Sequence, residues 1–265
     1  MPTIPTPVGS ASFYPIKGLF FFLRNENRIV LWKRIAKFTA EVGVAAVAIC
    51  GSLFRFTFYT QQGVVLKVLP HFLGTPGTIT LILIETAIPL TLFFYKRMQR
   101  VQQKLFVDVL SIQGIKVEKA SADEREWIDE QREIQRRETQ GQRPNIIRYL
   151  ADPATMYDRP LTKYLVTLPL NFVPVAGQAA FCWVNSMDMS TPLHHYYYSK
   201  LKGLTAEEEA TVIYYRRKQY EQFGLTATAL SLFPGADIVL LLTNAVGAAL
   251  WAADIEKAMA KRRKL

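Results

Sequence analysis

Four apolar blocks separated by charged segments dominate the sequence and predict its structural class. The first block covers residues 38–54, with Glu41 as its one charged residue, and the second covers residues 72–95, with Glu85 as its one charged residue. A helix rises about 1.5 Å per residue, so about twenty residues cross the hydrocarbon core of a bilayer. We therefore expect an all-α integral membrane protein with transmembrane helices over residues 38–59 and 72–95.

The fourth block, residues 222–253, is too long for one crossing and is interrupted near its middle. Its thirty-two residues contain one charged side chain, Asp237, which closely follows Pro234 and Gly235. Proline removes an amide donor and glycine frees the backbone, so the pair favours a turn between two shorter helical arms. We expect a re-entrant hairpin that enters the membrane and returns to the same side. A single kinked and tilted helix is the alternative.

The third block, residues 164–187, has the same interrupted pattern. It contains no charged residue, but Asn171, Pro174 and Gly177 lie within it. Each of its two arms is only about ten residues long, which reaches roughly halfway across a bilayer. The third block is therefore also predicted to be a re-entrant hairpin, and two spans plus two hairpins make up a single membrane domain over residues 1–265.

Counts of lysine and arginine beside the blocks predict the orientation. Residues 17–37 contain six basic residues, residues 96–163 contain fourteen, and residues 254–265 contain five, whereas only Arg55 and Lys67 lie between the first two blocks. Basic residues are enriched in the cytosolic loops of membrane proteins. Both termini and the long middle segment are therefore expected in the cytosol. Four full spans would satisfy the same counts.

The polar segments contain helix start signals. Ser121 and Thr205 are each followed three residues later by glutamate, the capping-box pattern in which a hydroxyl and a carboxylate satisfy free amides at a helix start. We therefore expect a helical insert within residues 96–163 and an amphipathic helix over residues 205–221.

Much of the positive charge that gives the chain its net charge of +10 lies in the segments that flank the apolar blocks. Anionic lipid headgroups are a nearer partner for such charges than nucleic acid, so we expect membrane lipids as partners and no nucleic-acid binding. Residues 15–37 mix aromatic with basic side chains and predict an interfacial helix. Residues 254–265 form a basic tail.

Catalytic and metal-binding patterns are missing from the sequence. Cys50 and Cys182 lie within apolar blocks and are expected to be packing residues. His71 lies at a membrane edge, and His194 and His195 open a His-His-Tyr-Tyr-Tyr run that resembles an interfacial aromatic belt. We find no zinc-ligand spacing, phosphate loop or nucleophile elbow, so the chain is predicted to be non-enzymatic and to hold no cofactor.

Three carboxylates within the apolar blocks are the candidate functional residues, because intramembrane charges are costly. Glu85 lies in mid-block and suits either an ion path or a buried hydrogen bond. Glu41 lies one turn from Lys37, with which it can pair, or its side chain can reach the interface. Asp237 follows a helix break, where a carboxylate can cap free amides.

A small-residue face in the first block favours close helix packing, so a homo-oligomer is possible. Its members are Gly43, Ala45, Ala46, Ala48 and Gly51.

Three sequence stretches resemble a known family. They are Leu-Pro-Leu-Asn-Phe-Val-Pro-Val-Ala-Gly at residues 168–177, Tyr-Arg-Arg-Lys-Gln-Tyr-Glu-Gln-Phe-Gly-Leu-Thr-Ala-Thr-Ala-Leu-Ser-Leu-Phe-Pro-Gly-Ala at 215–236, and Asn-Ala-Val-Gly-Ala-Ala-Leu-Trp at 244–251. Together with the opening at residues 14–24, they resemble the family of the etoposide-induced 2.4 protein and the bacterial sulfate transporter CysZ. The resemblance covers most of the chain except the insert around residues 115–160, and within the family it is closest to fungal outer spore wall or lipid-droplet proteins.

The resemblance implies two full spans and two pairs of half-penetrating helices, as the residues themselves suggest. It leaves two main functions open. One is a structural or lipid-organising role in the endoplasmic reticulum or at lipid droplets. The other is a sulfate or anion path in which helix N-terminal amides near Gly177 and Gly235 face the anion. A carboxylate at Asp237 would repel an anion from the second of these, and a proton-coupled path through Glu85 is a further alternative.

Overall fold

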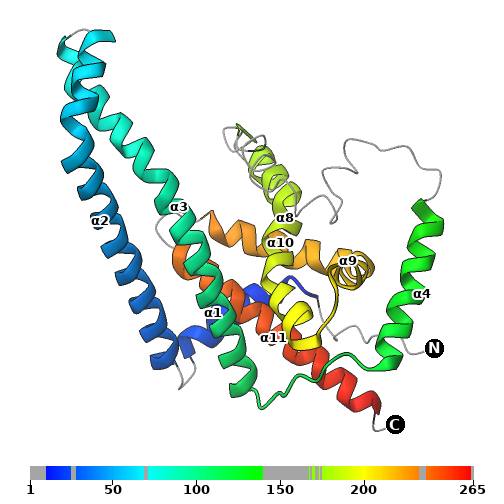
Figure 1. Cartoon of the computed structure of the whole chain (residues 1–265). Coiled ribbons are helices and arrows are strands. Elements are labelled where there is room, and N and C mark those ends of the chain that lie inside the picture. The colour runs from blue at the N-terminus through cyan, green and yellow to red at the C-terminus, as the bar shows by residue number, and fades with distance from the viewer. Residues whose placement is uncertain are drawn as a thin grey trace. The chain divides into compact units, whose positions relative to one another are not determined.

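The computed structural model of the chain describes residues 10–24, 28–68, 71–139, 175–232 and 237–263, together with 167, 169, 170 and 173. All regular elements in these ranges are helices, which confirms the all-α prediction (Figure 1). The chain divides into two units. We call residues 27–101 the two-helix unit, and residues 1–26 together with 102–265 the core unit.

The two-helix unit is a pair of very long helices. Helix α2 covers Arg28–Val68 and helix α3 covers His71–Ile112, whose last residues belong to the core unit. Forty-one residues of helix measure about 60 Å, twice the hydrocarbon thickness of a bilayer. The predicted spans therefore lie within longer helices.

The segment Trp32–Ser52 of α2 is long and apolar enough to cross a membrane, and only 11% of its most apolar stretch is buried within the protein. In the described structure this stretch does not pack as a core helix. The segment therefore supports association with a membrane.

The prediction of one interfacial helix over residues 15–37 is wrong. Helix α1, Phe13–Arg24, ends before α2 begins at Arg28, so residues 28–37 are the first turns of α2.

The core unit is built around α11, Asp237–Arg263. Its most apolar stretch is 78% buried, in contrast to that of α2. Helix α1 packs along α11 in the opposite direction, because Tyr14 donates a hydrogen bond to Asp254 (2.9 Å) while Gly18 lies on Gly247. A Cβ atom added at Gly18 would lie 2.8 Å from the Cα of Gly247, which shows how closely the two backbones approach.

Helices α10, Arg217–Ser231, and α11 pair as the two arms predicted for the fourth block. The Asn244 side chain reaches the carbonyl of Ala227 (3.5 Å), and Trp251 stacks on Phe223 with ring centroids 5.7 Å apart. Residue numbers rise on one helix as they fall on the other, so the arms are antiparallel. Helix α11 continues ten residues past the predicted arm, which ended at residue 253.

Helix α8, Ala176–Tyr196, lies beside α10 and also runs in the opposite direction. The backbone of Ser186 occupies the space a Cβ would need at Gly224, and beyond the end of α8 the Tyr198 hydroxyl accepts a hydrogen bond from Tyr220 (3.1 Å). Most of the first arm predicted for the third block lies outside the described residues. Helix α8 continues directly into a π-helix, η2, at Tyr197–Lys202.

Both capping boxes are confirmed. The Ser121 hydroxyl accepts from the Glu124 amide (3.3 Å) at the start of α4, Ala122–Thr139, and the Thr205 hydroxyl accepts from the Glu208 amide (3.3 Å) at the start of α9, Ala206–Tyr215.

The predicted helix over residues 205–221 is two helices, because the backbone at Arg216 leaves helical geometry (φ −96°, ψ 15°) between α9 and α10. The insert places Trp127 and Ile128 of α4 in the protein interior, and residues 140–163 lie outside the described ranges.

Candidate functional site

The three carboxylates that the sequence singled out are on separate helices. Glu41 on α2 forms an ion pair with Arg97 on α3 (2.6 Å). Arg97 therefore takes the role that the sequence suggested for Lys37. Glu85 lies within α3 and Asp237 is the first residue of α11, but their side chains are outside what the structure describes.

Of the predicted hairpin turns, Asn171, Pro174, Pro234 and Gly235 lie outside the described residues. Gly177 is described, and it is buried in the first turn of α8.

The chain that precedes α8 packs against the first turn of the helix. The Gly177 amide donates to the carbonyl of Val173 (3.1 Å), and the carbonyl of Leu170 lies where a Cβ at residue 177 would project. The residue before the helix, Val175, has φ 61°, a strained value for a β-branched side chain. The amide of Gly177 is therefore already used, and it does not face an open anion site.

The α8–α10 pair is apolar at one end and polar at the other. At the end where α8 begins and α10 finishes, exposed side chains include Val175, Trp183 and Leu232, whereas Lys200 and Lys218 are exposed at the opposite end. We call the first of these the apolar end. A helix pair that is polar at one end and apolar at the other suits entry into a membrane from one side.

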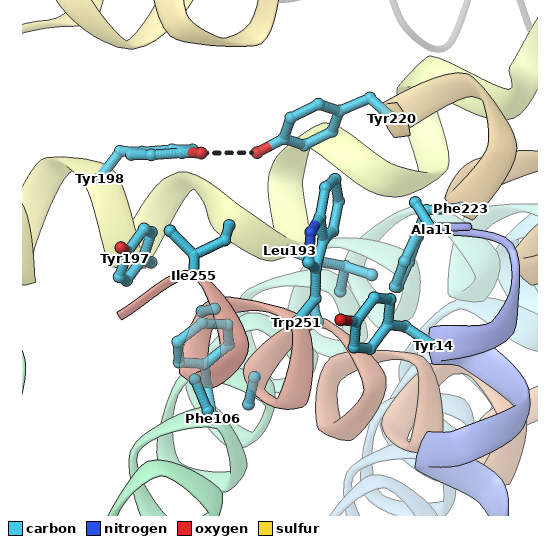
Figure 2. Close-up of a cluster of buried hydrophobic side chains, with 14 of the residues drawn as sticks. Ala11, Tyr14, Phe106, Leu193, Tyr197, Tyr198, Tyr220, Phe223, Trp251 and Ile255 are labelled. Atoms are coloured by element: carbon cyan, nitrogen blue, oxygen red, sulfur yellow. Dashed lines mark hydrogen bonds between the residues drawn. The ribbon is translucent and has the colours of Figure 1, made fainter. Parts of the chain in front are cut away.

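A buried aromatic cluster, not recognised in the sequence, occupies the middle of the core unit (Figure 2). His194 lies edge-on to Trp251 (4.7 Å between ring centroids) and to Tyr220 (5.3 Å). Burial lowers the pKa of His194 to about 3, although the carbonyls of Ser190 and Ala248 favour its protonated form. The ring is therefore neutral near pH 7.

The interpretation of His-His-Tyr-Tyr-Tyr as an interfacial belt is wrong for most of the run. His194, Tyr197 and Tyr198 are buried by protein, and only His195 is about half exposed. The Nδ1 atom of His195 lies 2.9 Å from the Glu209 carboxylate, which raises the pKa of His195 against the opposing effect of burial.

A buried ionic network lies beside the aromatic cluster. Lys202, which is 4% exposed, pairs with Glu256 (2.9 Å) and with Glu124 (3.4 Å), and the Tyr197 hydroxyl donates to Glu256 (2.5 Å). These residues come from α4, η2 and α11, so the network holds the insert on the rest of the core unit. Lys202 and Glu256 are 54 residues apart in sequence, and no local sequence pattern predicts their pairing.

The cavity next to this network has a volume of about 20 Å³. A single water molecule needs roughly 10–15 Å³ by the same measure, so there is room for water and not for an organic substrate. Among the described residues, no group of three His, Cys, Asp or Glu side chains is placed to hold a metal ion. Cys50 and Cys182 are free thiols.

Buried charges and exposed apolar surface lie in different parts of the structure. The core unit pairs the buried Lys202 with Glu124 and Glu256, which joins its helices, while apolar surface remains exposed on α1, α2 and the apolar end. A scan against protein-family models gave no match, and a search of curated proteins found none similar to this chain.

Proposed function

We propose that the chain is an integral membrane protein of the endoplasmic reticulum and lipid-droplet system, with a non-enzymatic, structural or lipid-organising role. The observation that supports this most directly is the segment Trp32–Ser52, which is long and apolar enough to span and is only 11% buried by protein. In this proposal α2 and the first half of α3 cross the bilayer, and both termini lie in the cytosol. The compartment rests on the resemblance of residues 168–177 and 215–251 to the fungal family members.

The lipid-organising part of the proposal rests on the apolar end of the α8–α10 pair. Helix α8 is 21 residues long, and apart from Pro192 its exposed apolar side chains lie in its first half, over about 12 Å of rise. That depth corresponds to less than one leaflet of a bilayer. An apolar end inserted to this depth displaces lipid in one leaflet only, which bends or thins the membrane around it.

A sulfate or anion path of the CysZ type is the second candidate. It is favoured by two buried polar atoms between α10 and α11, Thr228 Oγ1 and Asn244 Oδ1, which have no hydrogen-bond partner among the described residues. Polar groups inside a membrane domain often mark a transport path. The closed start of α8 at Gly177 weighs against it.

Membrane insertion is tested by depth measurement on the full chain in liposomes. In a Cys50→Ser, Cys182→Ala background, single cysteines at Val47, Val175 and Lys200 carry a fluorophore. Quenching by nitroxides on lipid acyl chains is expected at positions 47 and 175, and quenching by aqueous iodide at position 200. Iodide quenching at position 47 would overturn the proposal that α2 spans.

The lipid role is tested in liposomes that contain triolein, whose oil lenses are counted and sized by cryo-electron microscopy. The wild type is expected to change lens number or size, and Val175→Lys is expected to remove the effect, because a lysine in the hydrocarbon costs about 3 kcal/mol. Lys200→Gln serves as the control at the polar end. Equal lenses with and without inserted protein would refute a lipid-organising role.

The same vesicles without triolein decide the second candidate. Saturable uptake of radiolabelled sulfate, altered in Glu85→Gln or raised in Asp237→Asn, would put transport in first place. Uptake equal to that of empty vesicles would leave the lipid role as the working account.

A further inference from the structure

Four exposed basic side chains lie close in sequence to the residues through which α2 and α3 contact each other. Lys33 and Lys37 are on α2, and Lys96 and Arg100 are on α3. We call them the basic band. Each pair is spaced four residues apart, so its two members lie on the same helix face.

Two contacts place the two basic segments at the same level although some 60 positions separate them in sequence. Phe38 packs on Phe94 with ring centroids 5.5 Å apart, and Glu41 pairs with Arg97. Every member of the basic band is within five residues of one of these contacts on its own helix. Because Phe38 contacts Phe94 while α2 continues to Val68 and α3 begins at His71, the two helices run in opposite directions, and their basic segments belong to the same side of the apolar region.

Aromatic residues mark the same level. Trp32, 44% exposed, precedes Lys33, and Tyr95, 58% exposed, precedes Lys96. Tryptophan and tyrosine are enriched where the hydrocarbon meets the headgroups. Their positions, one on each helix, place the basic band at headgroup depth.

The charge of the basic band is not neutralised by carboxylates of the same unit. Between residues 28 and 101 the sequence contains two acids, Glu41 and Glu85, and Arg97 already pairs with Glu41. Like charges one turn apart destabilise a helix, so the band does not contribute to folding by itself. An anionic ligand would offset the repulsion.

We propose that the basic band binds the phosphate groups of anionic lipids in the cytosolic leaflet. The proposal rests on the membrane-spanning role of α2 and α3 proposed above. The guanidinium of Arg100 can hold a phosphate through two parallel hydrogen bonds, and the lysines act as point charges. Each basic residue near an anionic surface strengthens lipid binding about fivefold.

The test measures which lipids stay with the protein. The full chain is reconstituted in equal amounts of phosphatidylcholine and phosphatidylserine, extracted in mild detergent, and its bound lipids are quantified by mass spectrometry. The wild type is expected to retain phosphatidylserine severalfold over phosphatidylcholine. The band variant Lys33→Gln, Lys37→Gln, Lys96→Gln, Arg100→Gln is expected to lose this preference. Lys33→Arg, Lys37→Arg, Lys96→Arg is expected to keep it.

A charge-matched control removes four exposed basic residues from the insert: Lys116→Gln, Lys119→Gln, Arg136→Gln, Arg137→Gln. If this control loses as much phosphatidylserine as the band variant, net charge and not the band is responsible, and the proposal is overturned. Retention of the preference by the band variant overturns it as well. Displacement of the lipid by millimolar inorganic phosphate would reassign the band to soluble phosphate.

Failure of this proposal is distinguishable from failure of the proposed function. Depth quenching at Val47 reports whether α2 is inserted, independently of lipid type. An inserted wild type without lipid preference contradicts the basic band alone, whereas aqueous exposure at Val47 contradicts both.

Discussion

Removing one partner of the buried ion pair between Lys202 and Glu256 should cost about as much stability as removing both. Both residues are less than 10% exposed, and Lys202 Nζ lies 2.9 Å from the Glu256 carboxylate. Leaving one charge of a buried pair uncompensated costs about 3–5 kcal/mol. Glu256→Leu also removes the acceptor of the Tyr197 hydroxyl, while Glu124 still faces Lys202 at 3.4 Å. We expect the remaining Glu124 contact to limit the loss to about 3 kcal/mol, the low end of that range.

Lys202→Met should cost a similar amount, because Glu256 then keeps a buried charge with only the Tyr197 hydroxyl on it. The double variant removes both charges of the pair but leaves Glu124 without Lys202 and the Tyr197 hydroxyl without its acceptor. We therefore expect it within about 1 kcal/mol of either single variant, and not at the sum of the two losses. The double-mutant cycle should therefore give a coupling of several kcal/mol.

The free energy of unfolding is measured by denaturant titration in detergent micelles, followed by helical circular dichroism. The matched control is the exposed pair Arg137 and Glu133 (3.2 Å), whose side chains are 75% and 55% exposed. Its coupling should not exceed about 0.5 kcal/mol. Additive losses at Lys202 and Glu256, with the double variant the least stable of the three, would refute the reasoning that both charges are desolvated.

Three further predictions concern packing, protonation and capping. Gly18→Ala should lower the midpoint of thermal unfolding, because its new Cβ would meet the backbone of Gly247. Gly43→Ala, whose Cβ has no atom within 4 Å, should raise the midpoint through helix propensity worth about 1 kcal/mol. A shift of the same sign in both variants would contradict the close approach of Gly18 to Gly247. His194 has a pKa of about 3 in the folded state, so on acidification from pH 7 to pH 5 only the unfolded chain protonates this histidine, and the free energy of unfolding should fall by about 2 kcal/mol. His194→Phe should remove that loss. A pH profile that the substitution leaves unchanged would speak against burial of the ring. Thr205→Ala should cost about 1 kcal/mol by removing the cap of α9, measured by the same denaturant titration, with Thr205→Ser as the control that retains the hydroxyl.

The sequence predicted those features that depend on local chemistry. The capping boxes at Ser121 and Thr205 appear at the first turns of α4 and α9, because the hydroxyl and the glutamate involved are three residues apart. Likewise α10 ends at Ser231 and α11 begins at Asp237, on the two sides of the predicted break. These signals need no knowledge of the rest of the fold.

Features that depend on distant partners were missed. The break at Arg216 has no proline or glycine to mark it, and Arg216 is itself buried in the core unit. The burial of His194 depends on Tyr220 and Trp251, which approach from two other helices. The separation of α1 from α2 had a usable signal, since the asparagines of Asn25-Glu-Asn27 favour turns. The mixture of aromatic and basic residues on both sides outweighed it.

Hydropathy alone also fails to separate an exposed apolar helix from a core helix in this chain. The apolar segments of α2 and α11 pass the same test of length and composition, yet one is 11% buried and the other 78%. Small residues do not distinguish them either, because both helices contain glycine and alanine at spacings suited to close packing. The two helices differ in what packs against their glycines. Helix α1 covers Gly247 of α11, whereas nothing lies within 4 Å of a Cβ added at Gly43 or Gly51 of α2. The proposal that the chain enters a membrane therefore depends on α2, and it does not require α11 to be more than the core of its unit.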